Sequence, residues 1–364
     1  MTTVKPPIKQ HSQQSNATSL QTATLQAKRG GRISPCMIPI FAQSPGLCLH
    51  SSVGKLPLNW KDYLRNDENK TELFAFLPVE LLSLLQDIRI VSNVGSEIKS
   101  SVSLGSLLRD ISLEGLEEAD GRIILHSMDI ACGSARRIVI RSSDTDVLVL
   151  AVSFFHKLQK KGLKELWVLF GVGKDRRYLA AHDVASTLGE KKATALRFFH
   201  CLTRCDPVSY FASRGKRTAF SAWLTDEETG AFYKLSHPSD LPLPDDLISA
   251  VEKFIVRMYG VKDEEITSVV GARQYMFATL SRSVQAIPPT KGTLVKHILR
   301  AAYQAGQVWG RAADGTKTSS PDPWGWFLQD DKWVPVWTDD PVIWAECTAL
   351  DRYDCKTNCG TQRC

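Results

Sequence analysis

The sequence predicts an α/β fold. We expect a three-layer α/β/α core at about residues 87–224, built on a mostly parallel sheet and followed by a helical extension. The β-branched run at 138–140 is typical of a buried strand, and the apolar spacing becomes helical directly after it. A second apolar run at 166–170 predicts another strand, and helical periodicity dominates from Asp246 to Gly306. The strand at 137–141 is expected at the centre of the sheet.

The composition is that of an ordinary globular protein. Apolar residues make up 43% of the 364 residues and charged residues 23%, and the net charge of +6 permits an anionic partner. No apolar run approaches the roughly 18–20 residues of a membrane span, and residues 1–20 are too polar for a secretory signal. The cysteines number nine and are scattered, which indicates reduced thiols. We therefore expect an intracellular protein, nuclear or cytoplasmic, without membrane association.

The first half of the chain divides by its periodicity. Residues 1–55 are rich in Ser, Thr, Gln, Gly and Pro and are predicted to be weakly ordered. A helical lead-in follows at 56–86. Residues 88–91 and 98–102 are interpreted as two strands joined by an Asn-Val-Gly turn, and Glu117 opens a helix that ends near Gly133. The α/β domain is expected to occupy 87–224.

The second half is mostly helical. Residues 225–310 form the predicted extension, with helices at about 246–259, 263–281 and 291–306. Residues 311–346 are rich in Trp, and we interpret these side chains as anchors for a loop-rich segment rather than as stacking platforms for bases. In the tail at 347–364, Cys355, Cys359 and Cys364 offer three metal ligands, which leaves zinc binding open.

Two carboxylates stand directly after the strand at 137–141. Asp144 and Asp146 lie where ligands bind in open α/β sheets, at the carboxyl end of a strand. The alternative is structural, because Asp144 can cap the following helix and Asp146 can be an acid of its first turn. Similar positions are predicted for Glu118 and Asp120 at a helix start and for Asp206 after another helix. Crowded carboxylates require protons or cations, and Mg²⁺ prefers oxygen ligands.

Three further motifs have competing interpretations. Residues 171–175 contain Gly-x-Gly-Lys but lack the full spacing of a phosphate loop, so a hairpin turn is favoured. His200, Cys201 and Cys205 lack a second ligand pair at zinc-finger spacing, which favours buried thiols. The turn at 214–217 offers three cations at a helix start, and either a phosphate seat or a solvated basic turn accounts for it.

The order of these motifs resembles the PIN-like and flap-endonuclease-like nuclease superfamily. Members carry an E-A-E/D helix start, a strand followed by [ST]-x-D-x-D, and G-C-D before a basic turn that contains glycine. The matching segments are Glu118-Ala119-Asp120, Ser143-Asp144-Thr145-Asp146, Cys205-Asp206 and Arg214-Gly215-Lys216-Arg217. More closely, residues 60–337 resemble a broad family of uncharacterised animal proteins, often found among mobile-element-like genes. That likeness includes 69–74, 287–290 and 302–306.

The chain departs from the superfamily pattern at its beginning. The resemblance implies a first strand that ends in a metal-binding Asp, and nothing before Ile88 is similar to it, so we expect an N-terminally truncated relative. Arg204 stands where the superfamily has Gly before Cys-Asp, and Gly121 where the family mostly has Thr. Only the first few cysteines of the family's Cys-rich tail are present.

The resemblance implies a nuclease-like protein that uses Mg²⁺ or Mn²⁺ to act on DNA or RNA. Its carboxylates hold metal and carry catalysis, whereas basic residues of the following turn contact nucleic acid. The alternative is a catalytically degenerate PIN-like module that keeps nucleic-acid binding or protein interaction. The expected metal and catalytic residues are Glu118, Asp120, Asp144, Asp146 and Asp206, and the expected nucleic-acid contacts are Arg214, Lys216 and Arg217.

Overall fold

The computed structural model describes residues 59–85, 89–94, 97–101, 119–238, 241–279, 286–316 and 318–340. It is mixed α/β and mostly helical, with small sheets. Three sequence predictions lie outside the described residues: the weakly ordered start, the helix opening at Glu117 and Glu118, and the cysteine tail. Among the described residues, none of the helices is both long and apolar enough for a membrane crossing.

Two helices and a hairpin open the described chain. α1 (Trp60–Tyr63) and α2 (Asp67–Leu84) each begin at an asparagine whose side chain accepts backbone N–H groups, as an N-cap does. β1 (Val91–Val94) and β2 (Glu97–Ser100) then pair antiparallel. The predicted strand at 88–91 is therefore wrong in its bounds, because Asn93 and Val94 pair in the ladder instead of belonging to the turn.

The central sheet contains β3 (Arg137–Ser142), β4 (Glu165–Phe170) and β5 (Arg177–Ala180) in that order. β3 runs parallel to β4, which pairs antiparallel with β5. The connection between β4 and β5 includes a short 3-10 helix, Gly173–Asp175, so the prediction of a hairpin turn is confirmed. The prediction of a central strand at 137–141 is wrong for the described residues, in which β4 is central and β3 lies at an edge.

Helices pack on one face of this sheet. α4 (Ala119–Cys132) contacts α5 (Thr145–Lys160), while α5 and the longer α6 (Ala181–Thr203) contact β4 and each other. Ile138 and Ile140 point into this core, whereas the intervening Val139 is 43% exposed. A helix layer on both faces was predicted. Among the described residues, the side chains of β3 alternate between core and solvent, and those on its second face are exposed.

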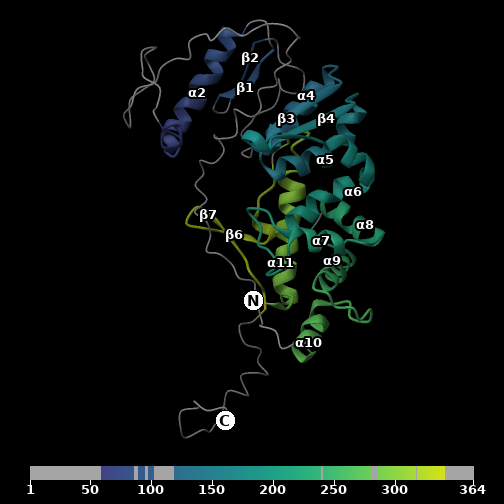
Figure 1. Ribbon diagram of the computed structural model, residues 1–364. Coiled ribbons are helices and arrows are strands. Elements are labelled where there is room, and N and C mark those ends of the chain that lie inside the picture. The colour runs from purple at the N-terminus through teal and green to yellow at the C-terminus, as the bar shows by residue number, and fades with distance from the viewer. Residues whose placement is uncertain are drawn as a thin grey trace.

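The remaining helices continue the same core rather than forming a separate one. α7 (Lys216–Ala222), α8 (Asp226–Leu235), α9 (Asp245–Met258), α10 (Val269–Thr279) and α11 (Lys291–Ala302) follow in order. A π-helical turn, Tyr303–Val308, extends α11. One cluster of buried apolar side chains extends from Ile123 to Trp324. In Figure 1, α10 lies at the end of the molecule opposite to β3 and β4.

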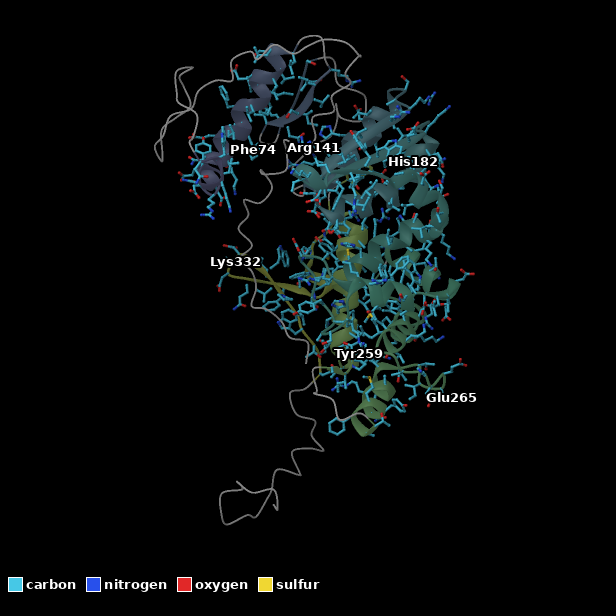
Figure 2. All side chains as sticks on the ribbon, in the orientation of Figure 1. Phe74, Arg141, His182, Tyr259, Glu265 and Lys332 are labelled. Carbon is cyan, nitrogen blue, oxygen red and sulfur yellow. The ribbon has the colours of Figure 1, made fainter. Side chains whose placement is uncertain are left out.

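The Trp-rich segment contains a hairpin that the sequence did not predict. A 3-10 turn, Asp322–Trp324, leads into β6 (Trp326–Gln329) and β7 (Lys332–Pro335), which pair antiparallel. Trp309 and Trp324 are buried, which confirms their role as anchors, whereas Trp333 and Trp337 are 37% and 40% exposed. Figure 2 shows Lys332 at the projecting tip of the hairpin.

Candidate functional site

Asp144 is the N-cap of α5. Its Oδ1 accepts the backbone N–H of Asp146 at 2.9 Å, and its own N–H donates to Ser142 Oγ at 3.0 Å. Such a cap contributes about 1 kcal/mol to the free energy of unfolding. The capping interpretation of Asp144 is therefore confirmed. The carboxylate is exposed at the carboxyl end of β3, where the strand turns into the helix.

Asp146 reaches the last turn of α6. Its Oδ1 accepts a hydrogen bond from His200 Nε2 at 2.8 Å, and the His200 side chain is only 6% exposed. α5 and α6 pack so that the N-terminal end of one meets the C-terminal end of the other. An acid is favourable at the first of these ends, because it complements the helix dipole. Sequence reasoning considered His200 only as a zinc ligand and missed this pairing.

Lys216 lies beside the same helix end. Its Nζ donates to the carbonyls of His200 at 2.9 Å and Arg204 at 2.6 Å, and to Thr203 Oγ1 at 3.4 Å. The His200 carbonyl also accepts the N–H of Arg204, so the ammonium group adds a further donor at the C-terminal end of α6. Burial lowers the pKa of Lys216. Lys216, which was expected to contact phosphate, thus also holds the C-terminal end of α6 in place.

Cys201 and Cys205 fill the space behind this contact. Both thiols are buried, as predicted. Burial, more than any neighbouring group, raises the pKa of Cys201, while the Asp146 carboxylate raises it further. The Cys201 thiol is therefore neutral, and both cysteines are buried packing residues near Asp146 and Lys216.

Asp206 follows the buried Cys205 and is itself exposed. Its loop is closed by a bridge between Cys205 and Val208. His297 of α11 secures the loop from below: its Nε2 donates to the Leu202 carbonyl at 2.7 Å, and its Nδ1 accepts from Ser209 Oγ at 2.7 Å. Burial lowers the pKa of His297 to about 4, so the ring is neutral and these donor and acceptor roles are consistent.

The two remaining acids come from the start of α4. Asp120 lies half-buried in its first turn, and Glu118 falls outside the described residues. Within the part of the chain that the structure describes, no three or more His, Cys, Asp and Glu side chains are grouped as a metal site would need. The convergence of all five carboxylates stays a prediction.

Two oxygens of the acid pair nevertheless face no protein donor. Asp144 and Asp146 each use Oδ1, as a cap and toward His200, and within the described ranges Oδ2 of each forms no hydrogen bond. Hard divalent cations bind carboxylate oxygens through one or two such groups and keep several waters. The donor chemistry at the end of β3 therefore fits Mg²⁺ or Mn²⁺.

The other basic residues of the 214–217 turn differ in their surroundings. The Arg214 guanidinium donates to the Tyr259 carbonyl at 3.0 Å and lies 4.7 Å from the centre of the Tyr259 ring. Burial raises the pKa of Tyr259 to about 12, so its phenol is neutral. Arg217 is exposed. Of the three expected nucleic-acid contacts, Arg217 is the one whose side chain extends into solvent.

Comparisons of this chain with protein-family models, with curated proteins and with solved structures found no match. The interpretation of the site therefore rests on its residues and their geometry.

Proposed function

We propose that this chain is a divalent-metal-dependent, nuclease-like protein with a core of PIN-like, three-layer ancestry, which acts on DNA or RNA phosphodiesters in the nucleus or cytoplasm. The observation that carries the proposal is the Asp146–His200 hydrogen bond. It connects the acid pair after β3 to the end of α6, and Asp206 follows that helix end within a few residues. This link supports a site in which acids from two distant segments share one end of the sheet.

In this proposal Asp144, Asp146 and Asp206 hold Mg²⁺ or Mn²⁺, together with Glu118 and Asp120. When bound, such an ion neutralises the carboxylates, activates a water and stabilises charge on a phosphodiester. His200 positions Asp146, because a hydrogen bond to one carboxylate oxygen leaves the other directed outward. Lys216 fixes the α6 end that carries Asp206, and Arg217 attracts the phosphate backbone.

A second candidate function is a degenerate module that binds nucleic acid without cleaving it. Three observations favour it: Asp144 serves as a cap, Asp146 is paired with a buried histidine, and Lys216 is bonded to helix carbonyls. Each of the three side chains therefore has a protein partner and needs no bound metal to stabilise it. In that case the carboxylates stabilise the fold and have no catalytic role.

Cleavage of labelled single strands and flaps in Mg²⁺ or Mn²⁺ separates the two candidates. We expect cleavage by the full chain and its loss in Asp206→Asn, whose side chain is exposed and so tolerates the change. The matched control is Asp245→Asn, an exposed acid in the first turn of α9. Metal binding without cleavage supports the degenerate module, and cleavage that survives Asp206→Asn contradicts the assigned site.

A further inference from the structure

The exposed face of the β3–β5 sheet presents an ordered set of side chains. Arg141, Leu169 and Tyr178 lie opposite one another on the three strands, as one row across the sheet. The next row contains Val139, Trp167 and Ala180. Tyr178 is 62% exposed and Val139 is 43% exposed. Aromatic or apolar groups come from two strands in the first row and from all three in the second, and no described helix covers them.

The two aromatic rings form a platform. Trp167 and Tyr178 contact edge to face, with ring centres 6.5 Å apart, and Trp167 is fixed because its indole N–H donates to Glu165 at 2.8 Å. His182 also contacts the Trp167 ring edge to face, at 4.9 Å between centres. Rings held in this way lose little conformational freedom when a ligand stacks on them. The platform is therefore preorganised for flat ligands.

The charge of this region is strongly positive. The sheet strands and the β4–β5 turn, residues 137–142 and 165–180, hold five Lys and Arg residues against two acids. Glu165 is neutralised, since it receives two hydrogen bonds of 2.7 Å from Arg137. Arg141 is exposed, and among the described residues its side chain forms no hydrogen bond or ion pair. Lys174 is exposed in the β4–β5 turn, whereas the exposed Arg177 pairs with Phe170 and so belongs to the opposite face of the sheet.

We infer that this face binds single-stranded nucleic acid, with bases stacked on Tyr178 and Trp167 and phosphates held by Arg141 and Lys174. Aromatic rings bind bases of any sequence, because every base has a flat face, and a basic rim follows the phosphate backbone. A duplex keeps its bases stacked inside the helix, so it cannot use the rings. This surface lies apart from the carboxylates, and it requires no metal.

Its position suits the proposed function without depending on it. Arg141 precedes Ser142 at the end of β3, just before the acid pair, so a strand bound on the sheet leads toward Asp144. Figure 2 shows Arg141 and His182 in the same upper part of the molecule, far from Tyr259 and Glu265. If the acids hold no metal, the sheet face still binds single strands.

The test is fluorescence anisotropy with the full chain in EDTA. The probes are labelled oligo-dT and oligo-U, each about 20 nucleotides long, enough to cover one stacking surface, and a DNA duplex of the same length. We expect both single strands to bind at least about tenfold more tightly than the duplex, a difference near 1.4 kcal/mol. Equal binding of duplex and single strands would overturn the inference.

Variants assign the binding to this face. Tyr178→Ala should weaken single-strand binding by about 5- to 150-fold, the range for loss of one stacked base, whereas Tyr178→Phe should retain it. Arg141→Gln should weaken binding and reduce its salt dependence by about one phosphate contact. Both side chains are exposed, so the urea midpoint of each variant should be unchanged. The control is Tyr275→Ala, a 40% exposed tyrosine on the remote α10.

Two results would contradict the assignment. Affinity within twofold of the unmodified chain in both Tyr178→Ala and Arg141→Gln would place any binding elsewhere, for instance at Arg217. Sedimentation of the free chain as a dimer that Tyr178→Ala converts to a monomer would show that a second copy covers the face.

Discussion

His200 Nε2 donates a 2.8 Å hydrogen bond to Asp146 Oδ1, across 54 residues of sequence. The imidazole is buried at the end of α6, whereas the carboxylate keeps partial access to solvent. This pair connects the strand–acid–helix segment to the loop that carries Asp206. It therefore contributes both to the stability of the α5–α6 contact and to the geometry of the proposed metal site.

Removal of the Asp146 carboxylate should show how much the Asp146–His200 hydrogen bond contributes to the free energy of unfolding. Asp146→Ala leaves the buried His200 N–H without an acceptor, which costs about 1–3 kcal/mol. Asp146→Asn keeps an acceptor oxygen and should cost less. Urea denaturation of both variants checks the order, and an Asp146→Ala variant as stable as the unmodified chain would disprove the structural role.

Two substitutions of Asp144 distinguish the effect of its negative charge from the effect of its N-cap hydrogen bond. Asp144→Ala should lower the free energy of unfolding by about 0.5–2 kcal/mol, whereas Asp144→Asn should change it little, because Asn is an equally good cap. Thermal or urea unfolding without divalent metal measures both. Equal losses in the two variants would mean that the charge, rather than the cap, stabilises α5.

Stability should fall as the pH falls from about 6.5 to about 4. Burial lowers the pKa of His126 and of His297 to about 4, so in this window the unfolded chain binds protons that the folded chain does not. The folded state consequently loses stability as the solution becomes more acidic. The free energy of unfolding at pH 7 and at pH 4.5 measures this loss. His297→Gln should lose less free energy of unfolding between the two pH values than the unmodified chain does. The same loss in both proteins would contradict the contribution of His297.

Gly189 is required by the backbone of α6. Its φ of 74° and ψ of 159° interrupt the helix in a conformation that only glycine adopts readily. Gly189→Ala should therefore destabilise the fold by about 1–3 kcal/mol. Gly230→Ala is the matched control, since Gly230 lies in α8 and alanine favours a helix interior. Urea denaturation compares them, and equal stability of the two variants would refute the backbone argument.

Local patterns predicted much of the fold and part of the site. The strand, cap and helix at 137–160 and the hairpin at 171–176 follow from short-range spacing, and the bounds of α9 are within one residue of the expected helix. Helical spacing predicts two short helices at 182–188 and 193–203, and Gly189 divides α6 between them. These features depend on neighbours in sequence, which a single chain displays directly.

Features that depend on distant segments were missed. β3 was interpreted as buried on both faces, although Arg137 and Arg141 alternate with its isoleucines and indicate one exposed face. The β6–β7 hairpin is different, because it had a local signal that was missed. Two Asp residues form its turn, with φ of 48° and 56°. The Asp146–His200 pair had no such signal, since helix packing rather than spacing brings it together.

Metal-linked stability tests the central claim most directly. If the acids after β3 bind Mg²⁺ or Mn²⁺, saturation stabilises the fold by RT ln(1 + [L]/Kd), about 2.7 kcal/mol at a hundredfold excess over Kd. The measurement is urea unfolding with and without metal, on the unmodified chain and on Asp144→Asn, which keeps the cap. We predict a metal-dependent gain in the unmodified chain and its loss in Asp144→Asn. A free energy of unfolding that neither metal changes in the unmodified chain would contradict the account and leave Asp144 and Asp146 as acids that serve the helix alone.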